Sequence, residues 1–126
     1  MSADACCCNG SSVTLIYACS GAANTGLLAD QVARRLASSG VGKMTCLAAM
    51  GAELSGFVAS AKAAGRNVVV DGCPVACGAA IFKKLDIPFE HYRTTDYGVE
   101  KGKTPITAEV MDKTHAAIRE TICPGR

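Results

Sequence analysis

The sequence predicts a single α/β domain of Rossmann-like type: a three-layer sandwich in which helices cover both faces of a four-stranded, mostly parallel sheet. Two observations lead to this fold class. Short apolar runs alternate with segments whose apolar residues recur at helical spacing, in the order β-α-β-α-β-α-β-α. Such alternation favours parallel pairing through right-handed crossovers. The chain has 126 residues, 49% of them hydrophobic, which is enough for one buried core and one domain.

The first half of the chain supplies a tail, two strands and a helix. Residues 1–12, MSADACCCNGSS, lack any periodicity and are expected to form a flexible tail before a domain over residues 13–126. The β-branched run VTLIYA at 13–18 precedes the glycine-bearing turn CSGAANTG and predicts a buried strand. Apolar residues at i, i+4 and i+8, followed by a glycine, predict a helix over 25–39. The run KMTCLAAM at 43–50 is expected to be the second strand.

The second half continues the alternation. An apolar stripe at i, i+3, i+4 and i+7 spans 54–61 and predicts a helix, and NVVVD at 67–71 predicts the third strand. The next apolar segment is expected to be a helix that ends before Pro88. FEHYRTT at 89–95 alternates like a strand with one wet face, at or near a sheet edge, and a last helix is expected over 107–121.

Composition and charge argue against several classes of partner. Charged residues make up 19% of the chain and the net charge is +2, so no electrostatic surface for nucleic acid or membrane is expected. No Lys or Arg precedes Arg34, and no apolar run approaches the length of a signal sequence or a membrane span. A cytoplasmic protein is therefore expected. In that setting, eight cysteines favour metal or redox chemistry over a disulfide scaffold.

Four of the cysteines follow or interrupt predicted strands. Cys19 ends the first strand, Cys46 lies within the second, and Cys73 and Cys77 follow the third. The carboxyl ends of parallel strands meet at one edge of a sheet, so these thiols are expected to converge there. Four thiolates can hold zinc or an iron–sulfur cluster. Cys46 could equally be a buried thiol inside its strand.

Other residues near these thiols are candidates for supporting roles. Ser20 and Gly21 precede a predicted helix and could hold an anion, although the same loop could be an ordinary strand-to-helix turn. Asp71 could orient a ligand from behind the thiols or cap the loop that follows it, and the cap is the simpler interpretation. A phosphatase-like use of Cys19 is disfavoured because CSGAANTG contains no arginine to bind a phosphate.

The motifs ACSGAANTG, GVGKMTCLAAMGAELSGFVASAKAA and VVVDGCPVACG together resemble the DGC-domain family, small proteins of bacteria and archaea named after an Asp-Gly-Cys motif. The similarity covers about residues 13–122 and includes Asp71, Gly72 and Cys73. The resemblance implies a metal-binding protein, with zinc as the metal and the four cysteines Cys19, Cys46, Cys73 and Cys77 as ligands. It implies no definite catalytic activity. Many relatives have a basic helix start after the second loop cysteine, whereas here Lys83 and Lys84 come a turn or two later, so a lysine is not expected to have a role beside the thiols.

Two function classes are consistent with the sequence. One is a metal-binding carrier, sensor or accessory factor, whose partner is the metal ion and whose protein partner is not identified. The other is a thiol redox or persulfide-carrying protein that uses Cys73 and Cys77. Lone histidines such as His91 are not expected to be ligands. The sequence assigns no role to four further cysteines: Cys6, Cys7, Cys8 and Cys123.

Overall fold

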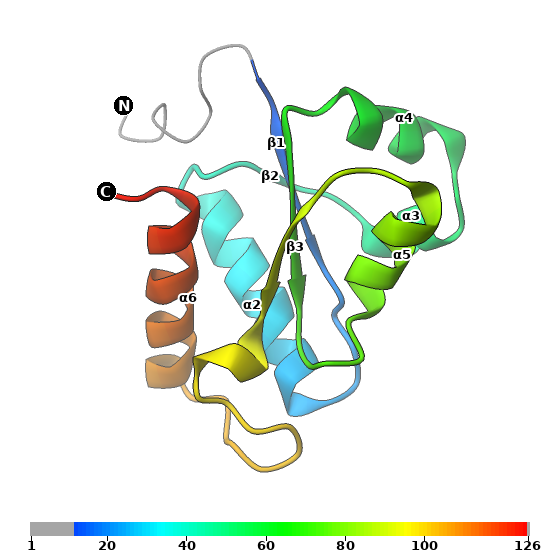
Figure 1. Cartoon of the computed structure of the whole chain (residues 1–126). Coiled ribbons are helices and arrows are strands. Elements are labelled where there is room, and N and C mark those ends of the chain that lie inside the picture. The colour runs from blue at the N-terminus through cyan, green and yellow to red at the C-terminus, as the bar shows by residue number, and fades with distance from the viewer. Residues whose placement is uncertain (1–11, 126) are drawn as a thin grey trace.

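The computed structural model describes residues 12–125, so the predicted tail, with Cys6, Cys7 and Cys8, lies outside the described residues except for Ser12. Strands and helices alternate along the chain as predicted (Figure 1). The elements are β1 (Thr14–Ala18), α2 (Asn24–Ser38), β2 (Lys43–Met44), α3 (Leu47–Gly51), α4 (Ser55–Ala63), β3 (Arg66–Asp71), α5 (Cys77–Leu85), β4 (Glu90–Arg93), the 3-10 helix η1 (Thr94–Tyr97) and α6 (Ala108–Ile122).

The four strands form one parallel sheet in the order β2-β1-β3-β4. The two central strands, β1 and β3, pair from Thr14 with Arg66 to Ala18 with Val70. Helices α2 and α6 cover one face, and α3, α4 and α5 cover the other (Figure 1). The predicted α/β sandwich with helices on both faces is confirmed.

Alternate side chains of the central strands build two separate apolar layers. Ile16 and Val68 pack toward α2 and α6, whereas Tyr17 and Val69 pack toward α3, α4 and α5. All five residues of β1 are buried, because a parallel strand between two helix layers has no face in water. This double burial is the reason that β1 and β3 are continuous apolar runs in the sequence.

The second strand is much shorter than predicted. Only Lys43 and Met44 pair with β1, and the last ladder hydrogen bond runs from the Thr45 N–H to the Ile16 carbonyl, at 2.9 Å. The rest of the predicted strand 43–50 is helical, in α3. The Leu-Ala-Ala-Met run consists of strong helix formers, and an edge strand with one neighbour gives little to oppose them. The assignment of Cys46 to a strand was therefore wrong: Cys46 is the residue that precedes the first turn of α3.

Two other boundaries also differ from prediction. The strand expected over 89–95 ends at Arg93, and η1 follows it, although its edge position is confirmed. The apolar stripe of α4 is only partly buried, since Leu54 and Phe57 remain exposed at 50% and 39%. A short helix at the rim of the domain packs only its inner side, and Phe57 instead borders a surface cleft. Within the described residues, no helix has the length and apolar character to cross a membrane.

The end of β3 passes very close to the first turn of α2. A Cβ atom placed on Gly72 would lie 2.7 Å from the backbone carbonyl carbon and oxygen of Thr25 and 2.8 Å from the nitrogen of Gly26. Because these neighbours are backbone atoms, they cannot rotate away as a flexible side chain would. Only glycine therefore allows the sheet and α2 to approach this closely here.

We predict that Gly72→Ala lowers the free energy of unfolding by about 1–3 kcal/mol, because overpacking against backbone forces the chain to shift. Urea denaturation measures this change. The matched control is Gly56→Ala in α4, where an added Cβ meets nothing within 4 Å. That control should be neutral or stabilising by up to about 1 kcal/mol. Equal losses in the two variants would contradict the close approach at Gly72.

Candidate thiol site at the carboxyl edge of the sheet

Three cysteines from separate segments line one open cleft. Cys19 follows β1, Cys46 lies between β2 and α3, and Cys77 is the first residue of α5. The cleft has a volume of about 840 Å³. The polar residues of its other walls are Ser20, Asp30, Arg34 and Thr45. The apolar residues of these walls are Ala18, Met44, Leu47, Ala48, Phe57 and Ile81. A smaller hollow of about 340 Å³ at the opposite edge of the sheet contains no cysteine.

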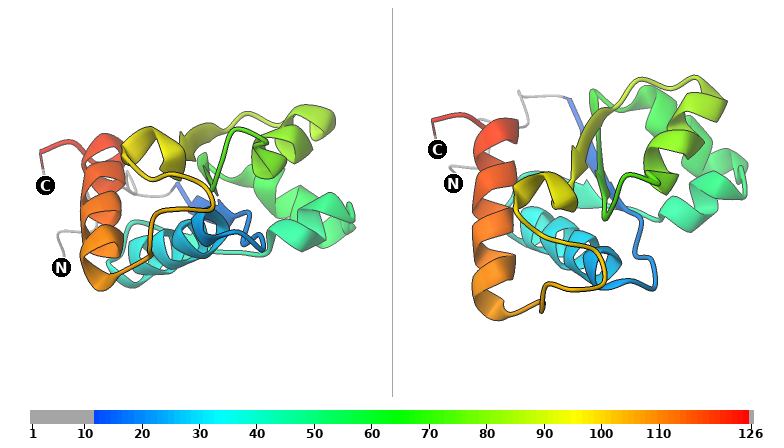
Figure 2. Two further views of the ribbon diagram at one scale, coloured as in Figure 1. Left: turned by 90° about the horizontal axis from the view of Figure 1, so that it is seen from below. Right: turned by 60° about the horizontal axis from the view of Figure 1, so that its bottom comes forward.

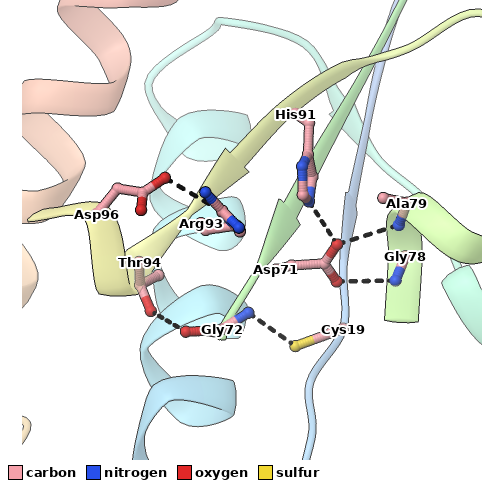
Figure 3. A network of polar contacts seen from close by, with 9 residues as sticks. All are labelled: Cys19, Asp71, Gly72, Gly78, Ala79, His91, Arg93, Thr94 and Asp96. Atoms are coloured by element: carbon pink, nitrogen blue, oxygen red, sulfur yellow. Dashed lines mark hydrogen bonds and ion pairs between the residues drawn. The ribbon is translucent and has the colours of Figure 1, made fainter. Parts of the chain in front are cut away.

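Asp71, the last residue of β3, organises the segment that carries Cys77. Its buried carboxylate accepts hydrogen bonds from the N–H groups of Gly78 at 2.8 Å and Ala79 at 3.0 Å (Figure 3). Nε2 of His91, on β4, lies 2.7 Å from the same carboxylate. The residue before α5, Ala76, provides no side-chain cap, so Asp71 supplies the missing acceptors from the neighbouring strand. Asp71 thus caps the start of α5, at the far end of the loop that follows β3.

Gly72 connects three elements through its backbone. Its N–H donates to the Cys19 sulfur at 3.3 Å, and its carbonyl accepts from Oγ1 of Thr94 at 2.8 Å (Figure 3). The Cys19 thiol is half-buried. Burial raises its pKa, and the charges of Asp71 and Cys77 act in the same direction, against the lowering effect of the Gly21 and Gly72 N–H groups. Cys19 therefore favours the protonated thiol unless a cation offsets the cost of ionisation.

Cys73 lies apart from the cleft and beside a lysine. Its sulfur is 3.4 Å from Nζ of Lys101, in the loop between η1 and α6. Partial burial acts to raise the pKa of Cys73, but hydrogen bonds from the N–H groups of Val75 and Ala76, together with Lys101, hold the pKa below its ordinary value. The pKa values of Cys73 and Cys19 are therefore shifted in opposite directions, and Cys73 is the more readily ionised thiol of the two.

Asn24, at the start of α2, holds the loop that carries Lys101. Its Nδ2 donates to the carbonyls of Glu100 at 3.1 Å and Thr104 at 2.8 Å, and its Oδ1 accepts from the Gly102 N–H at 2.7 Å. Figure 2 shows this loop crossing the carboxyl edge of the sheet next to the start of α2. A role for a lysine beside the thiols was not expected from the sequence. The available signal was that Lys101 lies in a loop that follows a strand, and such loops meet at this edge.

The other predicted residues have the following positions. Cys46 is exposed, which excludes the alternative of a thiol buried inside a strand. Ser20 donates from Oγ to Oδ1 of Asp30 at 2.9 Å, and the Gly21 N–H is hydrogen-bonded to Cys19. Anion binding by Ser20 and Gly21 stays a prediction. Cys123 is buried at the end of α6, far along the chain from the cleft segments.

The thiols are not arranged as a finished metal site. Among residues 12–125, no group of three or more His, Cys, Asp or Glu side chains lies in positions that could hold a metal ion. Cys19, Cys46, Cys73 and Cys77 are free thiols in this arrangement. Their role as metal ligands stays a prediction, and any binding would require the segments that carry them to move closer together.

Comparison with known proteins relates these residues to a family. The family model described as the DGC domain matches residues 15–118. Among curated proteins, the anaerobic and virulence modulator AnvM of Pseudomonas aeruginosa is 31% identical over 88 residues, which span 69% of this chain and 67% of AnvM. No solved structure matches the chain. The family-model match includes β1 from Leu15 onward, the Asp71-Gly72-Cys73 segment and the whole cleft.

We predict that Asp71→Asn lowers the free energy of unfolding by about 1–3 kcal/mol, because an amide nitrogen replaces one of the two oxygens that accept from α5. Amide hydrogen exchange at Gly78 and Ala79 should become faster. The control is Asp86→Asn, an exposed residue in the left-handed conformation that asparagine tolerates, with φ 57°. Unchanged protection at Gly78 and Ala79 in Asp71→Asn would show that the carboxylate does not cap α5.

A second prediction concerns the lowered pKa of Cys73. Lys101→Met should raise this pKa, because the nearby cation that favours the thiolate is removed. The rate of Cys73 alkylation by iodoacetamide, followed against pH with peptide mapping, measures the shift. At neutral pH the rate should fall. Lys103→Met, two residues away and paired with Glu100, should leave the profile of Cys73 in place. Identical profiles for both variants would remove Lys101 from the site.

Proposed function

The chain belongs to the DGC-domain family, and from this membership and the cleft geometry we propose that it is a metal-binding protein whose cysteines hold zinc. Cys19, Cys46 and Cys77 would be the ligands from the cleft, and Cys73 would be the fourth, supplied by the loop after β3. The observation that carries the proposal is that three free thiols from three separate segments line the same cleft. Bound zinc would supply charge that stabilises their thiolates together.

The chemistry of the cleft suits a soft cation. Thiolates prefer zinc or an iron–sulfur cluster over magnesium or calcium, which bind oxygen ligands. The carboxylate in the cleft, Asp30, already accepts from Ser20 and pairs with Arg34, at 2.9 Å and 2.8 Å. Both of its oxygens are therefore already bonded, and Asp30 offers no free oxygen ligand to a hard cation. An iron–sulfur cluster is the alternative occupant, and its visible absorption would distinguish it from colourless zinc.

The open arrangement of the thiols favours a carrier, sensor or accessory factor over a permanent structural site. A structural zinc site has its ligands closed around the metal, whereas these segments would have to draw together on binding. Metal occupancy would then be linked to the conformation of the loops at residues 45–47 and 72–77. Such linkage is what a metal-dependent sensor or a releasing carrier requires.

A second candidate is a thiol redox or persulfide-carrying protein that uses Cys73 and Cys77. The observation in its favour is the 3.4 Å contact between the Cys73 sulfur and Lys101, which suits a reactive thiolate. The name of AnvM describes that relative as a modulator of anaerobic behaviour and virulence. By analogy we propose a regulatory role tied to redox conditions for either candidate. We place the protein in the cytoplasm, where these four cysteines would stay reduced.

We predict that protein purified without oxygen binds zinc with micromolar or better affinity and that Cys77→Ser reduces the bound zinc to well below one equivalent. Elemental analysis and native mass spectrometry measure the content. Zinc at a hundredfold excess over its dissociation constant should stabilise the wild type by about 2.7 kcal/mol, because it binds only the folded state. This added stability should be lost in Cys77→Ser.

Two further variants complete this experiment. Cys73→Ser tests the fourth ligand and should also lower the zinc content, whereas Cys7→Ser, outside the described residues, should not. The metal proposal is wrong if the wild type takes up no zinc at micromolar concentration. A reversible Cys73–Cys77 disulfide, seen by mass spectrometry in that metal-free protein, would favour the second candidate.

A further inference from the structure

Arg34 brings a positive charge to the wall of the thiol cleft. It projects from α2 and lines the cleft together with Cys19, Cys46 and Cys77. The loop CSGAANTG contains no arginine, but the helix after it supplies one from a residue 15 positions beyond Cys19. Of the residues from 12 to 125 that line the cleft, Arg34 is the one with a positively charged side chain. It has no part in the proposed binding of metal, so its position requires another explanation.

The guanidinium is held by one edge. Nε of Arg34 donates to Oδ2 of Asp30 at 2.8 Å, and Oδ1 of Asp30 accepts from Ser20 at 2.9 Å. Asp30 is thus engaged at both oxygens and its side chain is 18% exposed, whereas Arg34 is 63% exposed. Within the described residues, the terminal nitrogens of Arg34 have no hydrogen-bond partner. Asp30 therefore orients Arg34 and leaves donors of the kind that recognise carboxylates.

The remaining walls define the chemical class of a ligand. The cleft volume of about 840 Å³ lies in the range of small-molecule sites, and Phe57 and Ile81 provide an apolar surface. Cys46 and Cys77 are both exposed, so sulfur chemistry in the cleft is accessible from solvent. A ligand that contacts the guanidinium, the apolar wall and the exposed thiols together needs an anionic group, a small apolar body and a sulfur atom.

We propose that the cleft binds a low-molecular-mass thiol that carries a carboxylate, or its disulfide, with the carboxylate on Arg34 and the sulfur next to Cys46 and Cys77. With the disulfide form, the thiolate of Cys46 or Cys77 attacks one sulfur of the ligand. A protein–ligand S–S bond forms, the S–S bond of the ligand breaks, and its other half leaves as a thiolate. The ligand disulfide is the oxidant, so the exchange needs no other redox partner.

The experiment compares two aromatic disulfides on metal-free protein. The first, 5,5′-dithiobis(2-nitrobenzoate), carries a carboxylate on each ring, and the second, 2,2′-dithiodipyridine, is neutral. All variants carry Cys73→Ser, because Lys101 beside Cys73 would add its own attraction for the anionic reagent. Stopped-flow absorbance gives the rates, and peptide mass mapping assigns them to Cys46 and Cys77.

Arg34→Gln should slow the anionic disulfide about fivefold, the effect of losing about 1 kcal/mol from an exposed ionic contact, and should leave the neutral disulfide unchanged. The matched control is Arg35→Gln. Arg35 is adjacent in the sequence but pairs with Asp112 of α6, on the other side of α2 from the cleft, so neither rate should change. Equal slowing of both reagents by Arg34→Gln, or equal effects of the two variants on the anionic reagent, would overturn the proposal.

An aliphatic pair of reagents separates a site for small thiols from a preference for aromatic rings. Reaction with 3,3′-dithiodipropionate should depend on Arg34, and reaction with the neutral 2-hydroxyethyl disulfide should not. If Arg34→Gln does not slow the reaction with 3,3′-dithiodipropionate, the proposal is also overturned. The inference rests on the use of the cleft thiols that the proposed function assigns. The disulfide experiments use metal-free protein, so they do not depend on zinc binding. If the protein binds no zinc but Arg34→Gln still slows the anionic disulfides, only the metal proposal is contradicted.

Discussion

The arrangement of the thiol site depends on one buried carboxylate, that of Asp71. A charge in the interior is costly unless hydrogen bonds replace the water it has lost. Asp71 meets this requirement with two backbone N–H groups from α5 and the ring of His91. These contacts tie the end of β3 to the start of α5 and to β4. The loop that carries Cys73 is therefore anchored at both ends, and Cys77 begins a helix whose position is set by the neighbouring strand.

Each residue of the Asp-Gly-Cys motif has a separate physical role. Asp71 caps α5, while Gly72 allows β3 to pass the backbone of α2 and uses its own N–H and carbonyl to reach Cys19 and Thr94. Cys73 then leaves the sheet toward Lys101. The motif thus connects β3 to α5, to the residues after β1 and to η1, and it also supplies one thiol. A substitution in it would disturb the cleft even where no thiol is lost.

The thiols lie in contrasting electrostatic surroundings. Burial raises the pKa of Cys19, whereas backbone N–H groups and Lys101 keep the pKa of Cys73 low. A metal that binds all four cysteines has to offset the cost of ionising Cys19 and compete with Lys101 for Cys73. The proposed small thiol would need only Cys46 and Cys77. Both ligands would act on an open site whose parts are held by the fold.

The sequence by itself determined the fold class, the two central strands and the long helices, because a buried parallel strand is apolar on both faces and a surface helix on one. It also placed Cys19, Cys73 and Cys77 at the carboxyl edge, because that follows from parallel topology alone. The strand predicted over 43–50 was right for Lys43 and Met44 and wrong beyond them, because apolar character does not separate a buried strand from a buried helix in so short a run. Only the tertiary structure brought Lys101 to Cys73, Arg34 to the cleft and His91 to Asp71. Lys101 and Cys73 are 28 positions apart, and His91 and Asp71 are 20 positions apart. These placements depend on how a loop, a helix and an edge strand pack at the sheet, which local periodicity does not encode.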